Sequence, residues 1–249
     1  MLKTYTATGI TLLVRRFRGS ERIATFFTRE QGKVEAVVSG VGKPGSKLAG
    51  ALEPFTLSQL FFAHGRNLER LTQAQVQQVW RHLPEDVITF GFAAWMAELT
   101  AQATEPGAPN PELFDALAAH LAALDAGATA PVVAAAYGLI LLEDLGIAPV
   151  LDRCARCGEQ TAGVEWYDAE AGGLVCGSCR TAEAELQLTP GHRALLRGLR
   201  RMAADRLHTL QPKEADIRQV LSLLRRHIIY HLGFALKSDA FLSQLGQRE

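Results

Sequence analysis

The chain has 249 residues, 48% hydrophobic and 21% charged, which is the composition of a folded globular protein rather than a disordered one. The longest apolar run, residues 130–142, is too short to cross a bilayer, and the N-terminal residues lack the charged-then-apolar layout of a secretory signal. Because the four cysteines are clustered rather than scattered, these features predict a cytoplasmic protein with no membrane contact.

The formal net charge is zero, but the charges are unevenly distributed along the chain. Residues 1–80 carry 11 Lys and Arg against 5 Asp and Glu, whereas residues 81–150 carry 1 Arg against 9 acids. Residues 151–249 carry 14 basic and 12 acidic side chains. Segregation of this kind predicts interaction surfaces outside the acidic middle, and an unevenly charged solvated surface is the simpler alternative.

The first eighty residues predict short β-strands joined by glycine-bearing turns. Alternating segments rich in Thr, Val and Ile place the strands at residues 5–17, 22–28, 33–41, 54–63 and 67–73. Five short strands without an intervening long helix favour a small closed barrel, of which the OB-fold is the commonest five-stranded case. A fragment of a β-sandwich is the alternative.

From Leu83 onward the hydrophobic period becomes helical. Helices are predicted at residues 83–104, 112–126, 131–145 and 214–232, and a further helix starts at Thr189 and Pro190. Asn110 is suited to cap the second helix, because Pro111 then opens it. The predicted fold is therefore α+β and multidomain, with an OB-type β-barrel at residues 1–80. An α-helical domain follows at residues 81–249 and contains an inserted four-cysteine lobe at about 152–180.

The inserted lobe holds all four cysteines in two C-x2-C pairs, Cys154 with Cys157 and Cys176 with Cys179. Two such pairs at this separation are the pattern of a tetrahedral all-cysteine zinc site, which leaves no position for water or substrate. We therefore expect one structural Zn²⁺ ion, with Gly158 and Gly177 supplying backbone freedom at the turns. A disulfide or redox pair is the alternative, although a redox dithiol needs only one C-x2-C pair.

A glycine-rich loop at residues 40–47 invites comparison with a phosphate-binding loop. It lacks the Gly-Lys-Ser/Thr ending of a Walker loop, because Ser46 separates Gly45 from Lys47. Pro44 also removes an amide that would face a phosphate. A flexible connector whose lysines reach a nucleic-acid backbone is the better interpretation.

Basic and aromatic side chains are interleaved in the predicted barrel. We expect DNA phosphates to be contacted by Arg15, Arg16, Arg18, Arg22, Arg29, Lys33, Lys43, Lys47 and Arg66. Exposed aromatic rings stack on unpaired bases, and the candidates are Tyr5, Phe26, Phe27, Phe61 and Phe62. Adjacent phenylalanines in a strand face opposite sides, so at most one of each pair lies in the core. The alternative is that the outward ring packs under a loop or a neighbouring domain.

A second basic cluster lies between residues 193 and 226, where 9 Lys and Arg outnumber 3 acids. Its expected DNA contacts, which recur at helical spacing, are Arg193, Arg197, Arg200 and Arg201. His227 and His231 are four residues apart, but no third metal ligand accompanies them, so we expect a packed or surface pair. No catalytic-triad spacing, paired acids or nucleophile motif indicates an active site.

Several short motifs, in their order and separations, resemble the RecO family of recombination mediators. They lie at residues 9–13, 27–33, 40–43, 52–55, 65–68 and 142–146, the last leading into Cys154. The resemblance covers essentially the whole chain. It implies a cytoplasmic, nucleoid-associated DNA-repair protein that is not an enzyme.

The resemblance also implies activities and partners. RecO proteins bind single- and double-stranded DNA, anneal complementary strands and, with the partner RecR, help load the recombinase RecA onto strands covered by single-strand binding protein (SSB). Contact with the acidic C-terminal tail of SSB belongs to the helical domain, where Tyr137 and Leu141 would line an apolar groove. The stretch 132–145 contains no Arg or Lys to receive the carboxylate of that tail.

Two other classes of function stay open from the residues alone. A zinc-stabilised nucleic-acid enzyme would need clustered carboxylates for a magnesium ion. The acids Glu85, Asp86, Glu98 and Asp115 are instead spread over helix ends and exposed faces. A zinc-stabilised adaptor without direct DNA binding would use the charge segregation for docking to proteins.

Overall fold

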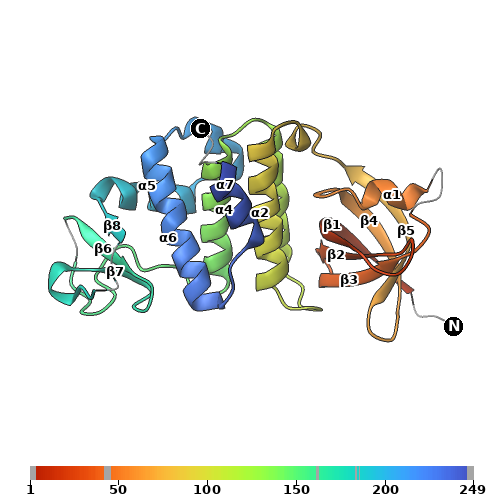
Figure 1. Cartoon of the computed structure of the whole chain (residues 1–249), viewed down its shortest axis with the longest axis horizontal. Coiled ribbons are helices and arrows are strands. Elements are labelled where there is room, and N and C mark those ends of the chain that lie inside the picture. Colours follow the sequence, from red (N-terminus) through yellow and green to blue (C-terminus); the bar gives the residue numbers. More distant parts are fainter. Residues whose placement is uncertain (1–3, 42–45, 161–162, 183, 185, 246–249) are drawn as a thin grey trace. The chain divides into compact units, whose positions relative to one another are not determined.

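The computed structural model describes residues 4–41, 46–160, 163–182, 184 and 186–245. It divides the chain into two compact units, unit 1 at residues 1–125 and unit 2 at residues 126–249, and each is described by itself. In Figure 1, unit 1 is coloured from red to yellow-green and unit 2 from green to blue. The helices between the barrel and Asp125 thus group with the barrel, whereas the later helices belong to unit 2. The division after residue 80 stays a prediction.

Unit 1 begins with five strands that close into a barrel: β1 (Thr4–Arg16), β2 (Arg22–Thr28), β3 (Gly32–Val38), β4 (Leu57–Ala63) and β5 (Glu69–Gln78). Their order around the barrel is β1-β2-β3-β5-β4, and β4 closes it by pairing with β1. Every pair is antiparallel except β3 with β5, which is parallel. The predicted OB-type barrel within an α+β chain is confirmed.

The barrel core follows from strand alternation. In β3, Val34, Ala36 and Val38 point inward, whereas Lys33 and Glu35 point outward. Phe26 of β2 and Phe62 of β4 meet edge to face in this core, with ring centroids 5.8 Å apart. Inward apolar residues from each strand thereby fill the interior of the barrel.

Phe27 points away from the barrel core, as strand parity requires, yet its side chain is also fully buried. It packs against Phe114, with ring centroids 6.1 Å apart. The expectation that Phe26, Phe27 and Phe62 stack on bases is therefore wrong, because all three rings are buried. Tyr5 and Phe61 are half-buried. For Phe27, the alternative of packing under a neighbouring element is confirmed.

The helices of unit 1 are α1 (Lys47–Ala51), α2 (Val87–Ala103) and α3 (Pro111–Asp125), with a 3-10 turn η1 (Leu83–Glu85) before α2. Asp86 caps α2 by accepting from the backbone N–H of Thr89 at 2.7 Å. Asn110 caps α3 as predicted, accepting from Leu113 N–H at 2.9 Å. α2 lies against β1 and β2, so it covers one side of the barrel.

Gly32, at the turn between β2 and β3, shows how closely the α2–α3 connection approaches the barrel. Its φ is +64°, and an added Cβ would lie 2.1 Å from the carbonyl oxygen of Ala108. Only glycine meets both conditions without displacing the backbone.

Unit 2 contains the helices α4 (Ala130–Asp144), α5 (Pro190–Arg201), α6 (Glu214–Leu232) and α7 (Lys237–Leu245), with the 3-10 turn η3 (Ala204–Thr209). α4 lies against both α5 and α6, and its middle is almost wholly buried, which explains the long apolar run. Tyr137 and Leu141 are fully buried in this helix. The expectation that these two side chains line a groove for a partner's tail is therefore wrong.

The four-cysteine lobe lies between α4 and α5 in the sequence. It contains β6 (Glu165–Asp168), β7 (Gly173–Val175), the 3-10 turn η2 (Gly177–Cys179) and β8 (Leu186–Leu188), with the sheet order β7-β6-β8. Among the described residues, every helix is too short or too polar to span a membrane.

Candidate metal centre and basic surfaces

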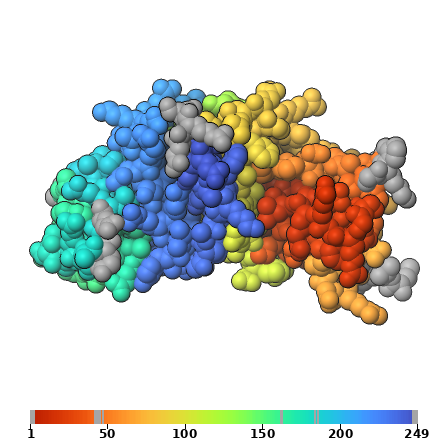
Figure 2. Space-filling view, in the orientation of Figure 1, coloured from red at the N-terminus to blue at the C-terminus, as the bar shows by residue number. Residues whose placement is uncertain are grey.

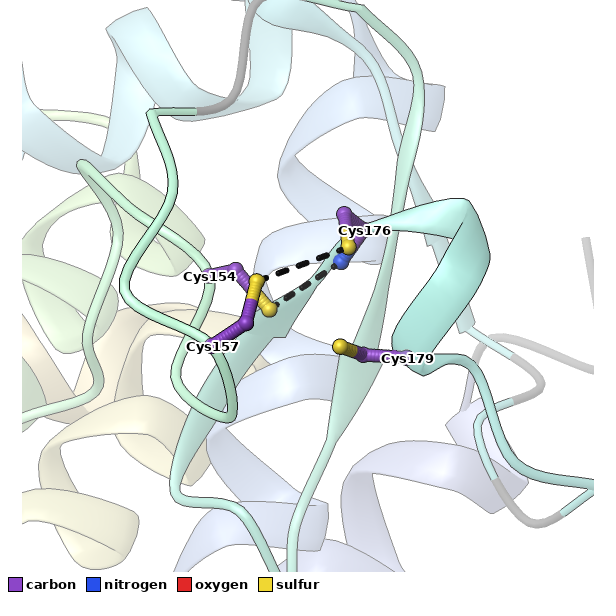
Figure 3. Close-up of side chains that lie close together, drawn as sticks. All are labelled: Cys154, Cys157, Cys176 and Cys179. Atoms are coloured by element: carbon purple, nitrogen blue, oxygen red, sulfur yellow. Dashed lines mark hydrogen bonds between the residues drawn. The ribbon is translucent and has the colours of Figure 1, made fainter.

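The four cysteines converge in the lobe (Figure 3). Cys154 and Cys157 lie on the turn that precedes β6, while Cys176 follows β7 and Cys179 ends η2. Their sulfur atoms all lie within 4.8 Å of one another, and all four are free thiols. Within the described residues, no other group of three or more His, Cys, Asp or Glu side chains is arranged to hold an ion. The predicted pairs thus form one cluster that could hold a metal.

The spacing of the sulfur atoms fits a tetrahedral ion. Metal–sulfur bonds of about 2.3 Å give a tetrahedron with sulfur–sulfur edges of about 3.8 Å. The Sγ atoms of Cys157 and Cys176 lie 3.8 Å apart. The backbone N–H of Cys176 also donates to Sγ of Cys154 at 3.4 Å, which stabilises a thiolate there. The donor set fits a metal ion held by four thiolates.

The thiols differ in how readily they ionise. Burial raises the pKa of Cys154, but backbone hydrogen bonds from Cys157, Cys176 and Arg156 outweigh it and lower this pKa to about 6. For Cys179, side-chain hydrogen bonds with Cys176 and Cys157 raise the pKa to about 12. One thiolate therefore opposes ionisation of its neighbours. A divalent metal would remove this repulsion and displace the remaining protons.

The two glycines expected to shape the turns, Gly158 and Gly177, differ in backbone conformation. Gly158 has φ +78°, in the left-handed region, and its N–H donates to the carbonyl of Cys154 at 2.9 Å. Gly177 is not in that region, and an added Cβ would make only an ordinary contact with Trp166 at 3.8 Å. The predicted backbone role is therefore confirmed for Gly158 and wrong for Gly177.

A buried ion pair joins the lobe to α5. Nη1 of Arg193 lies 2.9 Å from Oε2 of Glu165 on β6, and both side chains are less than a tenth exposed. Arg193 also donates to the carbonyl of Gly163 at 3.2 Å. Because its guanidinium is committed inside the fold, we leave Arg193 out of the DNA surface proposed below.

A buried histidine joins the lobe to α6. Nε2 of His227 lies 2.5 Å from the carbonyl oxygen of Ile147, which can only accept, so this nitrogen carries the proton. Nδ1 then accepts from the hydroxyl of Tyr167 on β6 at 2.6 Å. Burial lowers the pKa of His227 to about 4. The ring of His231 packs on it with centroids 4.2 Å apart, so the packed pair is confirmed.

Four of the predicted DNA-contacting residues gather on the hairpin that joins β1 to β2, which we call the arginine hairpin (residues 15–22): Arg15, Arg16, Arg18 and Arg22. The first three are exposed and Arg22 is half-buried. Arg16 stands opposite Arg22 across the strands. Like charges in this position destabilise a strand pair, so the pairing of Arg16 with Arg22 does not favour folding. Arg15 does have a partner within the barrel, Glu35 at 3.7 Å. Figure 2 shows the red N-terminal segment, which includes β1, at the surface of unit 1.

The other basic residues of the barrel lie apart from this hairpin. Arg29 pairs with Asp115 of α3, and Nζ of Lys33 donates to the carbonyl of Ala101 in α2 at 2.7 Å. Both therefore hold the barrel to its own helices. Arg66 is exposed on the loop between β4 and β5. Lys43 lies outside the described residues, and Lys47 begins α1.

A pocket of about 460 Å³ in unit 2, which we call the arginine pocket, is lined by three arginines of the second basic cluster. Its charged lining consists of Glu143, Asp152, Arg153, Arg197, Arg200 and Arg201. Arg197 and Arg201 are exposed. Arg200 forms a bidentate salt bridge with Glu143 at the end of α4. The hydrogen bond from Arg200 lowers the pKa of Glu143.

Two residues of these surfaces were missed by sequence reasoning. Arg153 joins the arginine pocket from the segment before Cys154, and nothing in the local sequence places it beside α5. Phe17 lies on the arginine hairpin with 43% of its surface exposed. Its position between Arg16 and Arg18 was the available signal.

Comparison with known families agrees with this architecture. Residues 1–80 match the family described as Recombination protein O N terminal, and residues 84–240 match Recombination protein O C terminal. The chain belongs to the RecO family.

Individual relatives match over nearly the full length. The chain is 34% identical over 247 residues to the DNA repair protein RecO of Pelotomaculum thermopropionicum, covering 99% of this chain and 96% of that protein. It is 35% identical to the DNA repair protein RecO of Heliobacterium modesticaldum, covering 99% and 92%. It is also 35% identical to that of Anaeromyxobacter dehalogenans strain 2CP-C, covering 96% of each chain. The resemblance inferred from the motifs is confirmed, and the chain is a DNA repair protein of the RecO family.

Proposed function

We propose that this chain is a recombinational-repair mediator of the cytoplasm and nucleoid. It binds single- and double-stranded DNA, anneals complementary strands and, with RecR, helps load RecA onto SSB-coated single strands. The proposal is carried by the exposed arginine hairpin on an OB-type barrel, in a chain of the RecO family.

Annealing requires electrostatics rather than a nucleophile. Two polyanions must approach, so their phosphates need neutralising while the bases stay free to pair. Arg16 and Arg18 offer exposed guanidinium groups, and beside them lies exposed Arg15, whose guanidinium is 3.7 Å from the carboxylate of Glu35 on β3. The arginine pocket offers a second set, centred on Arg197 and Arg201. Each neutralised phosphate releases counterions, and this release supplies affinity that is independent of base sequence.

The metal has a scaffolding role in this proposal. Cys154, Cys157, Cys176 and Cys179 would hold one Zn²⁺ ion, which supplies four bonds and no open position for chemistry. The lobe has a very small core of its own, formed by Cys154, Val175 and Ala184. Its order therefore depends on the bonds to sulfur and on its contacts with α5 and α6.

RecR and the SSB tail are proposed as partners only because the chain belongs to the RecO family. Because Tyr137 and Leu141 are fully buried, we assign the tail no site on these two side chains. An interaction assay with each purified partner tests this part separately from DNA binding.

DNA binding by the full-length protein is tested with labelled single- and double-stranded oligonucleotides over a salt series. Replacing Arg16 and Arg18 together by Gln should lower affinity for both about tenfold in dilute buffer. The dependence of log affinity on log salt should become shallower by about 0.7 per lost contact on single strands. Arg218→Gln is the matched control, because Arg218 is an exposed arginine of α6 that pairs only loosely with Glu214.

Annealing of complementary labelled strands is measured in parallel without divalent metal or nucleotide. The proposal requires annealing to persist there and to fall in the Arg16 and Arg18 variant. Absence of DNA binding by the unmodified protein, even in dilute buffer, would instead favour the adaptor. A requirement for magnesium would favour the enzyme.

A further inference from the structure

Phe17 is the one exposed Phe, Tyr or Trp side chain among the described residues of unit 1. The aromatic rings named as stacking candidates from the sequence are buried or half-buried, whereas 43% of Phe17 faces solvent. An isolated exposed apolar side chain needs no explanation by itself. What distinguishes Phe17 is its place within the most arginine-rich segment of the barrel.

The backbone around Phe17 is fixed. Its N–H donates to the carbonyl of Glu21 at 3.1 Å, and the N–H of Glu21 donates to the carbonyl of Arg18 at 2.8 Å. The hydroxyl of Ser39 donates to the carboxylate of Glu21 at 2.7 Å, which ties the hairpin to the end of β3. The ring is therefore presented from a closed turn, so little entropy is lost when a ligand stacks on it.

The ring already has a planar cationic neighbour. The guanidinium carbon of Arg18 lies 5.2 Å from the centroid of the Phe17 ring, within cation–π range. A nucleobase is also planar and stacks on aromatic rings without regard to its sequence. It can occupy a face of Phe17 while Arg16 and Arg18 pair with the flanking phosphates.

We propose that Phe17 is a base-stacking residue that makes the arginine hairpin prefer unpaired DNA to duplex. This inference rests on the proposed DNA-binding function and adds a source of selectivity to it. Phosphates are accessible in both forms of DNA, so the arginines do not discriminate between them. The faces of bases are accessible only in a single strand, because in duplex they are stacked on one another.

The test compares Phe17→Ala, Phe17→Leu and Phe17→Tyr in the full-length protein. Phe17→Leu keeps an apolar side chain but has no aromatic face, whereas Phe17→Tyr keeps the face. Val14→Ala is the matched control, since Val14 is an apolar residue of β1, the strand that leads into Phe17, and is 38% exposed. Circular dichroism should show wild-type structure for every variant, because the replaced side chains are exposed.

Affinity is measured for a single-stranded oligonucleotide, the matching duplex and an abasic strand of equal length. Phe17→Ala and Phe17→Leu should each weaken single-strand binding about tenfold, the loss typical of one stacked base. Binding to duplex and to the abasic strand should change less than twofold. The salt dependence should be unchanged, because no charge is removed. Phe17→Tyr and Val14→Ala should bind as the unmodified protein does.

Equal losses on the single strand and the abasic strand would overturn stacking, as would wild-type affinity in Phe17→Leu. If the unmodified protein prefers single strands and Phe17→Ala keeps that preference, the selectivity arises elsewhere. Failure of the DNA-binding function itself is distinguishable, because then the unmodified protein binds none of the three probes.

Discussion

His227 shows how a single buried side chain makes a fold sensitive to pH. Both of its ring nitrogens are engaged, one by Tyr167 of the lobe and the other by the carbonyl of Ile147. Burial disfavours the protonated form, and the neighbouring His231 adds a smaller effect in the same direction. Protonation would break the bond from the Tyr167 hydroxyl to Nδ1, which needs the lone pair of that nitrogen.

The stability of unit 2 should therefore fall as the solution becomes acidic. The pKa of His227 is about 4 in the folded chain, whereas an unfolded histidine titrates near 6.5, so the unfolded state takes up the proton first. The stabilisation is complete above about pH 6.5 and is lost between there and about pH 4. Urea unfolding should show a loss of about 2 kcal/mol between pH 7 and pH 5 that His227→Gln does not show.

The comparison with His227→Gln is needed because the cysteine thiols also respond to acid. Their contribution is common to both proteins and cancels in the difference. Tyr167→Phe is a second control, since it removes the hydroxyl but leaves His227 buried and should keep most of the pH dependence. Parallel curves for the unmodified protein and His227→Gln would refute this assignment.

At the scale of elements, the ends of α4 and α5 meet in an ion pair that occupies part of the arginine pocket. Glu143 binds the guanidinium of Arg200 with two hydrogen bonds. A carboxylate of the protein itself thus binds an arginine that would otherwise be available to DNA phosphates. A phosphate that enters the pocket has to compete with Glu143 for Arg200.

Glu143→Gln should therefore strengthen DNA binding, by about two- to fivefold in dilute buffer, and steepen its salt dependence. Asp144→Asn is the matched control, because it removes the same charge from the adjacent exposed position. A salt titration compares the DNA affinities of the two variants with that of the unmodified protein. Equal gains in the two variants would mean that net charge, rather than release of Arg200, is responsible.

Several elements could be predicted because their signals are local. Residues 22–28 and 214–232 were predicted with the bounds the structure gives to β2 and α6. Thr189 caps α5 by accepting from the N–H of His192, and Pro190 opens that helix, as its sequence indicates. The short helix α1, the helix α7 and the three strands of the lobe were not predicted. These are short elements held by tertiary contacts, so their own sequences contain little signal.

At the scale of the whole molecule, the lobe is joined to the rest of unit 2 at several points. Glu165 pairs with Arg193 of α5, and Tyr167 hydrogen-bonds His227 of α6. Loss of the metal would therefore weaken contacts well outside the four cysteines. The barrel has a core of its own in unit 1.

Cys154→Ser should lower the zinc content below one ion per chain, because it replaces one of four thiolates with a hydroxyl, which is not among the usual zinc ligands. We expect the melting temperature of unit 2 to fall by several degrees, while residual DNA binding by the arginine hairpin persists. Elemental analysis and differential scanning calorimetry measure the two effects. Unchanged stability in a zinc-free variant would contradict a scaffolding role for the metal.

The sequence by itself determined the features that depend on neighbours along the chain. Strand alternation predicted the five strands of the barrel, helix caps predicted where α3 and α5 begin, and two C-x2-C pairs predicted the cysteine cluster. Each of these signals is a matter of hydrogen bonding, backbone dihedrals or ligand spacing over a few residues.

Only the tertiary structure decided which side chains are available at the surface. Phe27 is covered by Phe114, and Arg193 is neutralised by Glu165, in both cases by residues far away in the sequence. Phe17 is left exposed although it has the same side chain as Phe27. Burial and charge pairing depend on what packs from elsewhere in the chain, so residue type alone could not separate the arginines that face solvent from those that hold the fold together.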